Sequence, residues 1–187
     1  WNGSLDPSND NTSYGDWTGT LIFHVDKGEE PYARNANASW GEKNMGKAST
    51  LVSFVEYAVS TYPAEHYALI LWNHGLGYIG VCWDYDNMMD NLTLNELRDA
   101  LSEIYSRLNI RIDVLGFDAC LMGMTDVVYS CRDFVDLVVF SQEVEPESGW
   151  PYDEILAELT SNPLISPREL AKMIVDEYID CLLYTSP

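Results

Sequence analysis

Lysine and arginine are scarce in this chain of 187 residues, which has 10 of them against 30 Asp and Glu and a formal net charge of −20. Most of the acidic residues lie after residue 84. Such a surface repels phosphate backbones, which argues against a nucleic-acid partner. It would attract cationic ligands, basic peptides or Ca²⁺, although solubility is the default role for most of these charges.

The sequence also lacks long apolar runs and the cysteine spacings that are typical of metal sites. The longest apolar run, near residues 68–72, is the length of a strand, whereas a membrane helix needs roughly 20 residues. The four cysteines, at positions 82, 120, 131 and 181, form no CxxC pair and no Cys/His metal spacing. The length and a hydrophobic content of 47% suit one folded domain without a membrane span.

Strand and helix patterns alternate along the chain. Two helix starts carry capping boxes, Thr93 with Glu96 and Ser166 with Glu169. The alternation predicts a mostly parallel sheet with helices on both faces, and ligands bind such sheets beyond the carboxyl ends of the strands. Residues 26–43 are expected to be irregular. The expected strands are residues 18–25, 67–72, 79–83, 112–117 and 137–141, and the expected helices are residues 49–62, 94–108, 121–131, 151–159 and 167–182.

A histidine and a cysteine follow two of these strands. His74 comes just after the strand at 67–72, and Cys120 just after the strand at 112–117. A histidine can act as the base that activates a cysteine thiol. The amides of Gly75 and Cys120 could form an oxyanion hole, and a helix beginning at Leu121 would favour the thiolate. A His-Gly turn or a core cysteine is more often structural when it occurs alone, but their joint position favours catalysis.

Acidic residues stand beside the same strand ends. Asp118 lies two residues before Cys120, where a carboxylate raises the pKa of the thiol and so opposes catalysis. That cost would be tolerated if Asp118 held a cationic substrate, which predicts a pocket for Arg or Lys; the competing interpretation is a helix cap. Glu143, Glu145 and Glu147 could deepen such a pocket, bind Ca²⁺ or simply be solvated.

Around these residues the sequence resembles the clostripain family of cysteine peptidases, in the clan that also holds caspases, gingipains and legumain. The most specific match is FDACLM at 117–122 with NHG upstream at 73–75. The resemblance extends over most of residues 44–178, with further matching pieces at 44–51, 92–97, 112–116 and 141–152.

The resemblance implies a caspase-like three-layer α/β/α sandwich and a cysteine endopeptidase. Cys120 matches the family nucleophile, His74 the catalytic histidine and Asp118 the acid that selects Arg or Lys at the cleaved bond. Substrates would be polypeptides with basic residues, cleaved through a thioester acyl-enzyme, with Glu143 as a further substrate-binding candidate. The chemistry needs no cofactor, although some members require Ca²⁺. Such a peptidase would be secreted or act at the cell surface, although no signal peptide is visible here.

Family members begin with a further strand and helix that this chain does not show. We therefore expect residues 1–17 to be a polar lead in a loop conformation. Residues 18–180 would form a peptidase domain truncated at its N-terminus. The abrupt end CLLYTSP, residues 181–187, is expected to be a non-native tail.

Two other functions remain open. A glycoside hydrolase could use the strand-end carboxylates Asp118, Glu143 and Glu145 as acid and base, although a barrel needs about 250 residues and His74 and Cys120 would be idle. A non-catalytic binding module could present an acidic surface on the same fold. Alkylation of Cys120 should inactivate a peptidase but not a glycosidase.

Overall fold

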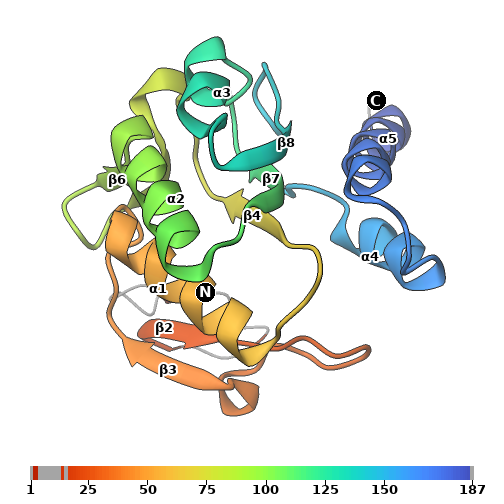
Figure 1. Ribbon diagram of the computed structural model, residues 1–187. Coiled ribbons are helices and arrows are strands. Elements are labelled where there is room, and N and C mark those ends of the chain that lie inside the picture. Colours follow the sequence, from red (N-terminus) through yellow and green to blue (C-terminus); the bar gives the residue numbers. More distant parts are fainter. Residues whose placement is uncertain (1, 4–13, 15–16, 186–187) are drawn as a thin grey trace. The chain divides into compact units, whose positions relative to one another are not determined.

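The computed structural model describes residues 2–3, 14 and 17–185, with side chains to residue 182 (Figure 1). The chain divides into two compact units, which are described separately. Unit 1 comprises Trp1–Met45 and Asp84–Asp90, and unit 2 comprises Gly46–Trp83 and Asn91–Pro187. Most of the expected lead at 1–17 and the last two residues of the expected tail lie outside the described residues, whereas positions 181–185 continue a helix.

Unit 1 contains a small antiparallel sheet in the order β1-β2-β3, formed by Asn2–Gly3, Gly19–Ile22 and Ala38–Gly41. A short 3₁₀ turn, Ala33–Asn35, precedes β3. Two expectations are corrected here. The strand expected at 18–25 is shorter and pairs antiparallel outside the parallel sheet, and the stretch expected to be irregular contains β3. Strand β3 has only four residues and none of them is buried, so its pattern gives little hydrophobic signal.

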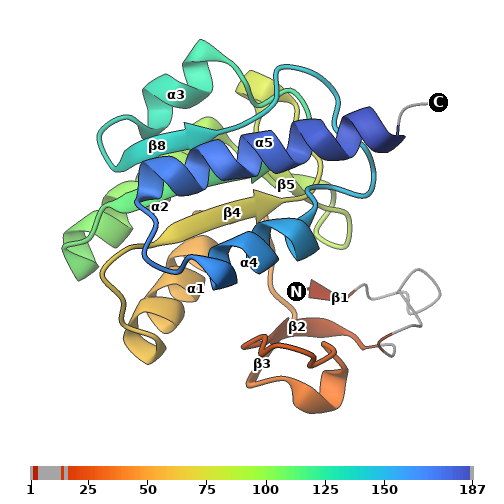
Figure 2. The same cartoon turned by 90° about the vertical axis from the view of Figure 1, so that its right-hand side faces the viewer.

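Unit 2 is built on a parallel sheet in the order β4-β7-β8, formed by Ala68–Trp72, Ile112–Asp118 and Val135–Val139. Helices cover both faces of this sheet (Figure 2), which confirms the predicted α/β/α sandwich. The helices are α1 (Ala48–Thr61), α2 (Leu94–Leu108) and α3 (Thr125–Cys131) over one face, and α4 (Tyr152–Ser161) and α5 (Pro167–Thr185) over the other.

The side chains of β7 supply both halves of the core. Successive residues of a strand point to opposite faces, so Leu115 packs with α1 and α2 while Val114 packs with α4 and α5. Gly116 lies under the Trp150 ring, where an added Cβ would be 2.8 Å from a ring carbon. This close approach brings the segment that follows β8 next to the carboxyl end of β7.

Two helices begin directly after a residue whose side chain caps the first turn. The Glu96 N–H donates to Thr93 Oγ1 at 3.3 Å, and the Thr93 N–H donates to Glu96 Oε2 at 3.2 Å. Ser166 and Glu169 make the same reciprocal pair. Both predicted capping boxes are therefore confirmed.

The helix expected at 121–131 starts later than predicted, at Thr125. Leu121 has a left-handed backbone with φ of 62°. The Leu121 N–H donates to the Glu143 carbonyl and the Gly123 N–H to the Ser141 carbonyl. Because these amides bind the chain after β8, residues 121–124 form an irregular connection before α3.

The segment between β4 and α2 contains a 3₁₀ turn, Gly77–Ile79, and a two-stranded sheet. Its strands are β5 (Val81–Asp84), which was predicted, and β6 (Asp90–Leu92), which was not. Within the part of the chain that the structure describes, no helix has the length and apolar character needed to cross a membrane.

Candidate active site

The parallel pairing of β4 and β7 brings the His74 and Cys120 segments together. Trp72 is in register with Asp118, so His74 and Cys120 each stand two residues beyond a matched pair at the carboxyl edge of the sheet. The Asn73 N–H donates to the Asp118 carbonyl at 3.4 Å and continues this pairing past the strand ends. The predicted juxtaposition of the two segments on neighbouring strand ends is present in the structure.

Backbone hydrogen bonds to β5 fix the loop that carries His74. The Cys82 N–H donates to the His74 carbonyl at 3.2 Å, and the Leu76 N–H donates to the Gly80 carbonyl at 3.0 Å. The Trp83 N–H donates to Asn73 Oδ1 at 3.0 Å. The bridge between Gly75 and Val81 uses the groups flanking Gly75, so the Gly75 amide takes no part in it.

Gly75 touches the backbone beside Cys120. A Cβ added at Gly75 would lie 2.4 Å from the Cys120 carbonyl oxygen and 3.0 Å from Ala119 Cβ and Met122 Cγ. Only glycine fits this position without moving the chain around Cys120. The sequence offers no signal for this packing role beyond the glycine itself.

The Cys120 thiol lies against the backbone of Glu145. The Glu145 N–H donates to Cys120 Sγ at 3.3 Å, and Sγ lies 3.9 Å from the Glu145 carbonyl oxygen. The predicted contribution of a helix N-terminus at Leu121 is wrong, because α3 begins at Thr125.

The thiols of Cys82 and Cys131 have a different environment. Burial raises the pKa of each to about 12, and Cys131 belongs to the core cluster under α3. Such thiols stay protonated and unreactive at neutral pH. Cys120 accepts an N–H bond at its sulfur and lies beside the His74 loop, which makes it the better nucleophile of the three.

Asp118 is 3% exposed and is held by the segment after β8. Its Oδ2 accepts the Trp150 N–H at 3.1 Å and the Tyr152 hydroxyl at 2.8 Å. The helix-cap interpretation of Asp118 is wrong, because α3 has Met124 at its N-cap and no side-chain cap. Burial, followed by the nearby Asp118 carboxylate, raises the pKa of Tyr152, which therefore remains a neutral donor. The sequence analysis missed both aromatic partners, whose only signal is their place after the acidic loop.

The segment after β8 contains Glu143, Glu145 and Glu147. Of these three acids, it is Glu145 that lies next to Asp118. Burial is the main cause that raises the pKa of Glu145 to about 8, and contact with the Asp118 carboxyl adds to it. A hydrogen bond from the Trp150 side chain acts in the opposite direction. Glu143 and Glu147 are exposed, although the Glu143 carbonyl accepts the Leu121 N–H.

Gly149 packs against the carboxyl group of Asp118. It has φ of +68°, and a Cβ added there would lie 2.8 Å from Asp118 Oδ2 and 3.1 Å from Trp72 Nε1. The backbone at this glycine therefore packs directly against the Asp118 carboxylate. The resulting site has two acids and an adjacent thiol, which suits a cationic ligand.

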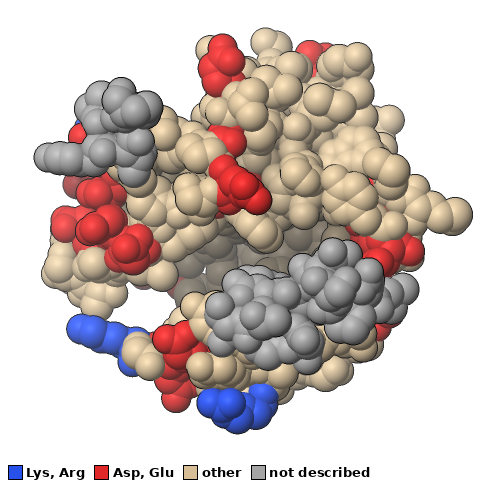
Figure 3. Space-filling view, turned by 180° about the vertical axis from the view of Figure 1, so that it is seen from behind, with Lys and Arg blue, Asp and Glu red and all other residues tan. Residues whose placement is uncertain are grey.

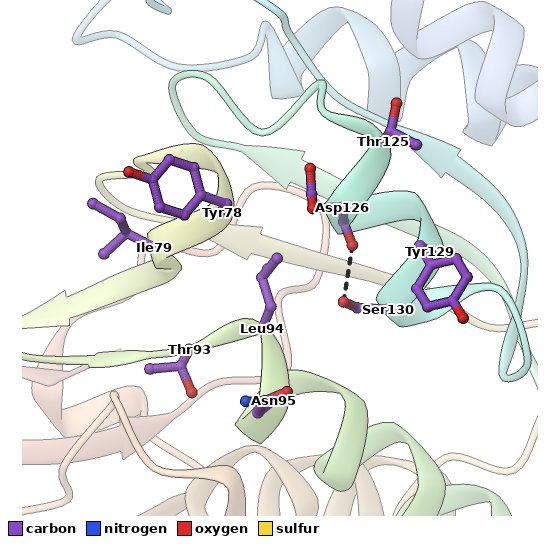
Figure 4. A pocket seen from close by; sticks show the side chains of 9 residues that line it. All are labelled: Tyr78, Ile79, Thr93, Leu94, Asn95, Thr125, Asp126, Tyr129 and Ser130. Atoms are coloured by element: carbon purple, nitrogen blue, oxygen red, sulfur yellow. Dashed lines mark hydrogen bonds between the residues drawn. The ribbon is translucent and has the colours of Figure 1, made fainter.

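Two further surface features are seen among the described residues. A pocket of about 660 Å³ opens between the 3₁₀ turn after His74, the start of α2 and α3, with Tyr78, Leu94 and Tyr129 among its walls (Figure 4). It contains none of the predicted site residues. Figure 3 shows acidic side chains exposed at several separate places on the molecular surface.

Among the residues that the structure describes, no group of three or more His, Cys, Asp or Glu side chains is arranged to hold a metal ion. The loop acids that could have bound Ca²⁺ are divided, with Glu145 turned to Asp118 and the other two exposed. A Ca²⁺ requirement stays a prediction.

Comparison with known proteins identifies relatives along most of the chain. The family model Peptidase C11, described as the clostripain family, matches residues 23–185. Clostripain of Hathewaya histolytica is 31% identical over 166 residues, which cover 75% of this chain and 31% of clostripain. Neither alternative function, glycosidase or binding module, finds support among these relatives.

Solved structures agree with the fold. A secreted C11 cysteine protease from Bacteroides thetaiotaomicron, in complex with an irreversible peptide inhibitor, matches with a TM-score of 0.70 and 25% identity over 82% of this chain and 42% of its own. An inactive zymogen C11 protease from Parabacteroides distasonis shares the fold, with a TM-score of 0.63 and 22% identity over 81% of this chain and 41% of its own.

The chain spans less than half the length of each of these relatives. The match to the family model nevertheless covers His74, Cys120, Asp118 and the loop after β8. On the extent of this match and the identity to clostripain, the chain belongs to the clostripain family of cysteine peptidases.

Proposed function

We propose that this chain carries the catalytic centre of a cysteine endopeptidase that cleaves polypeptides after Arg or Lys. The observation that supports it best is the register of β4 with β7, which sets His74 and Cys120 at matching positions beyond two adjacent strands. The buried acid Asp118 stands at the same edge.

In the proposed reaction, His74 removes the proton of the Cys120 thiol and the thiolate attacks the carbonyl carbon of the substrate. The amides of Gly75 and Cys120 donate to the oxyanion that forms. The imidazolium of His74 then protonates the leaving amine, and the peptide bond breaks to leave a thioester on Cys120. Water, deprotonated by His74, hydrolyses the thioester and restores the thiol.

Asp118 is the proposed recognition group for the basic side chain. Its Oδ2 is fixed by Trp150 and Tyr152, so the carboxylate is held in place before substrate arrives. A charge pair formed away from water contributes more than an exposed one. Glu143 has an exposed side chain and holds Leu121 through its carbonyl, so any contribution from Glu143 would come at the outer rim of the site.

One relative supports a proposal on where this activity takes place. The Bacteroides thetaiotaomicron neighbour is a secreted protease, and we propose that this protein also acts outside the cytoplasm, secreted or at the cell surface. The dyad chemistry needs no cofactor, and Ca²⁺ would act only on the stability or arrangement of the loops. The peptidase domain is proposed to span residues 18–180, and the candidate catalytic residues all fall in unit 2.

Asp118→Asn tests the proposed specificity. We expect kcat/KM for a peptide with Arg before the cleaved bond to fall by roughly 100-fold or more, because a buried charge pair is worth several kcal/mol. The same peptide with citrulline, which has the shape of Arg without its charge, should lose little. Asparagine keeps an oxygen that can accept from Trp150 and Tyr152, so the melting temperature should stay close to that of the wild type.

The result that would refute the pocket is an equal loss on the Arg and citrulline peptides. Glu147→Gln serves as the matched control, since it removes one negative charge from the same loop at an exposed position. That variant should retain the discrimination between the two peptides.

A further inference from the structure

Glu145 is unusual because one oxygen of its carboxyl group is buried without a hydrogen bond to any described residue. Its Oε2 is buried and has no hydrogen-bond partner among the residues that the structure describes. Its carboxyl group contacts that of Asp118, and its backbone N–H donates to Cys120 Sγ at 3.3 Å. An unpaired buried carboxyl oxygen is costly unless a ligand completes its contacts.

We propose that Glu145 is the second carboxyl group of the pocket for the basic side chain. Before a substrate cation binds, Glu145 shares a proton with Asp118. It releases this proton when the cation binds. This inference rests on the proposed function, because it concerns the same pocket. It makes recognition of a basic residue dependent on pH through Glu145.

The charged and titratable neighbours support one shared proton. Asp118 faces Glu145 from the end of β7, Tyr152 from α4 and Tyr178 from α5. Burial, with smaller effects from Glu145, Asp118, Cys120 and Cys181, raises the pKa of Tyr178 to about 12, so both tyrosines stay neutral. Two like charges in contact cannot both ionise easily, so a proton held between them lowers the free energy of the pair.

The direction of the pH effect follows from linkage. With a pKa of about 8, Glu145 is protonated at lower pH, whereas a bound cation would favour the ionised form. Binding of a cation below pH 8 therefore expels a proton. The affinity should rise by up to about tenfold per pH unit toward pH 8 and level off above it.

Benzamidine, a small amidinium that cannot be cleaved, is a suitable probe because its binding does not depend on the acylation step. For the wild-type chain we expect its inhibition constant to fall steeply from about pH 6 to pH 8. In Glu145→Gln the profile should be flat, since glutamine does not ionise but can still donate to Asp118. The two proteins should bind alike at low pH, and the variant should bind roughly tenfold or more weakly above pH 8. Glu147→Gln should follow the wild type.

Calorimetry on the wild-type protein provides a test without any substitution. Titration of benzamidine in two buffers with different ionisation enthalpies counts the protons released. We expect nearly one proton at pH 7 and nearly none at about pH 9.5, well above the pKa of Glu145.

Stability without ligand gives a readout that is independent of activity. A carboxyl whose pKa is raised on folding stabilises the protein below its unfolded pKa, and this contribution is lost as the pH rises through the folded pKa. Glu145→Gln should therefore melt at the same temperature as the wild type near pH 5 and a few degrees higher near pH 9.

The outcomes separate the inference from the function on which it rests. If benzamidine binds and Asp118→Asn weakens it, but no proton is released and Glu145→Gln keeps the wild-type pH profile, the role of Glu145 is refuted while the basic pocket stands. If benzamidine does not bind and peptides with Arg and citrulline are cleaved equally, the pocket itself is refuted.

Discussion

Replacing Cys120 by alanine should abolish peptide cleavage. The thioester cannot form without the sulfur, and no other described thiol combines partial exposure, a backbone N–H donor and the neighbouring His74 loop. His74→Ala should lower kcat by several orders of magnitude, because the two residues act as one proton-transfer unit. The measurement is steady-state cleavage of a fluorogenic peptide with Arg before the cleaved bond.

Cys82→Ala is the matched control for this prediction. Cys82 has a buried thiol whose pKa is about 12, and its backbone N–H, which holds the His74 carbonyl, is retained in alanine. This variant should remain active. If Cys82→Ala silenced the enzyme while Cys120→Ala stayed active, the assignment of the nucleophile would be wrong.

Gly75→Ala should lower kcat/KM by about 100-fold or more. The new methyl group would lie 2.4 Å from the Cys120 carbonyl oxygen, a distance that Cβ atoms do not adopt, so the backbone of His74 or of Cys120 must move. The same movement would displace both amides proposed for the oxyanion hole. Cleavage kinetics, with circular dichroism to show that the fold is kept, measure the effect.

Gly28→Ala separates this effect from the general cost of replacing a glycine. Gly28 has a positive φ, so alanine is strained there, but nothing lies within 4 Å of the added methyl group. It lies in unit 1, away from the candidate residues in the sequence. We expect a small loss of stability and wild-type activity. A Gly75→Ala enzyme as active as this control would contradict the close packing of the two active-site segments.

The sequence predicts the site well where a short pattern determines local structure. Continuous apolar runs predict β4, β7 and β8, and parallel strands with helical crossovers bring their carboxyl ends to one edge. That geometry is enough to predict the meeting of His74 with Cys120. The capping boxes at Thr93 and Ser166 likewise depend on residues three positions apart.

Features that depend on contacts distant in the chain escape the sequence. The helix after Cys120 starts late because the amides of Leu121 and Gly123 bind the segment after β8. Sequence spacing also gives no means to choose among Glu143, Glu145 and Glu147, which alternate in one acidic run. The choice follows from the Gly116–Trp150 contact and from the bonds of Asp118 to Trp150 and Tyr152, which position this loop against the strand end.

Unit 1 is a second case in which contacts between distant parts of the chain escape prediction from the sequence. Its strands are short, and no position of β3 is buried. The pairing of β3 with β2 joins residues that are separated by an irregular stretch. Hydrophobic periodicity is weak in such strands, so the antiparallel pairing could be recognised only from the folded chain.

The most direct test of the central claim is covalent labelling by a peptide chloromethyl ketone with Arg next to the reactive group. The nucleophilic thiolate would displace chloride and form a stable thioether, and digestion with mass spectrometry would locate it. We predict one adduct per chain, on Cys120, with labelling slowed by benzamidine and absent in Cys120→Ala. An adduct on Cys82, Cys131 or Cys181, with Cys120 unmodified in protein that has lost its activity, would contradict the assignment.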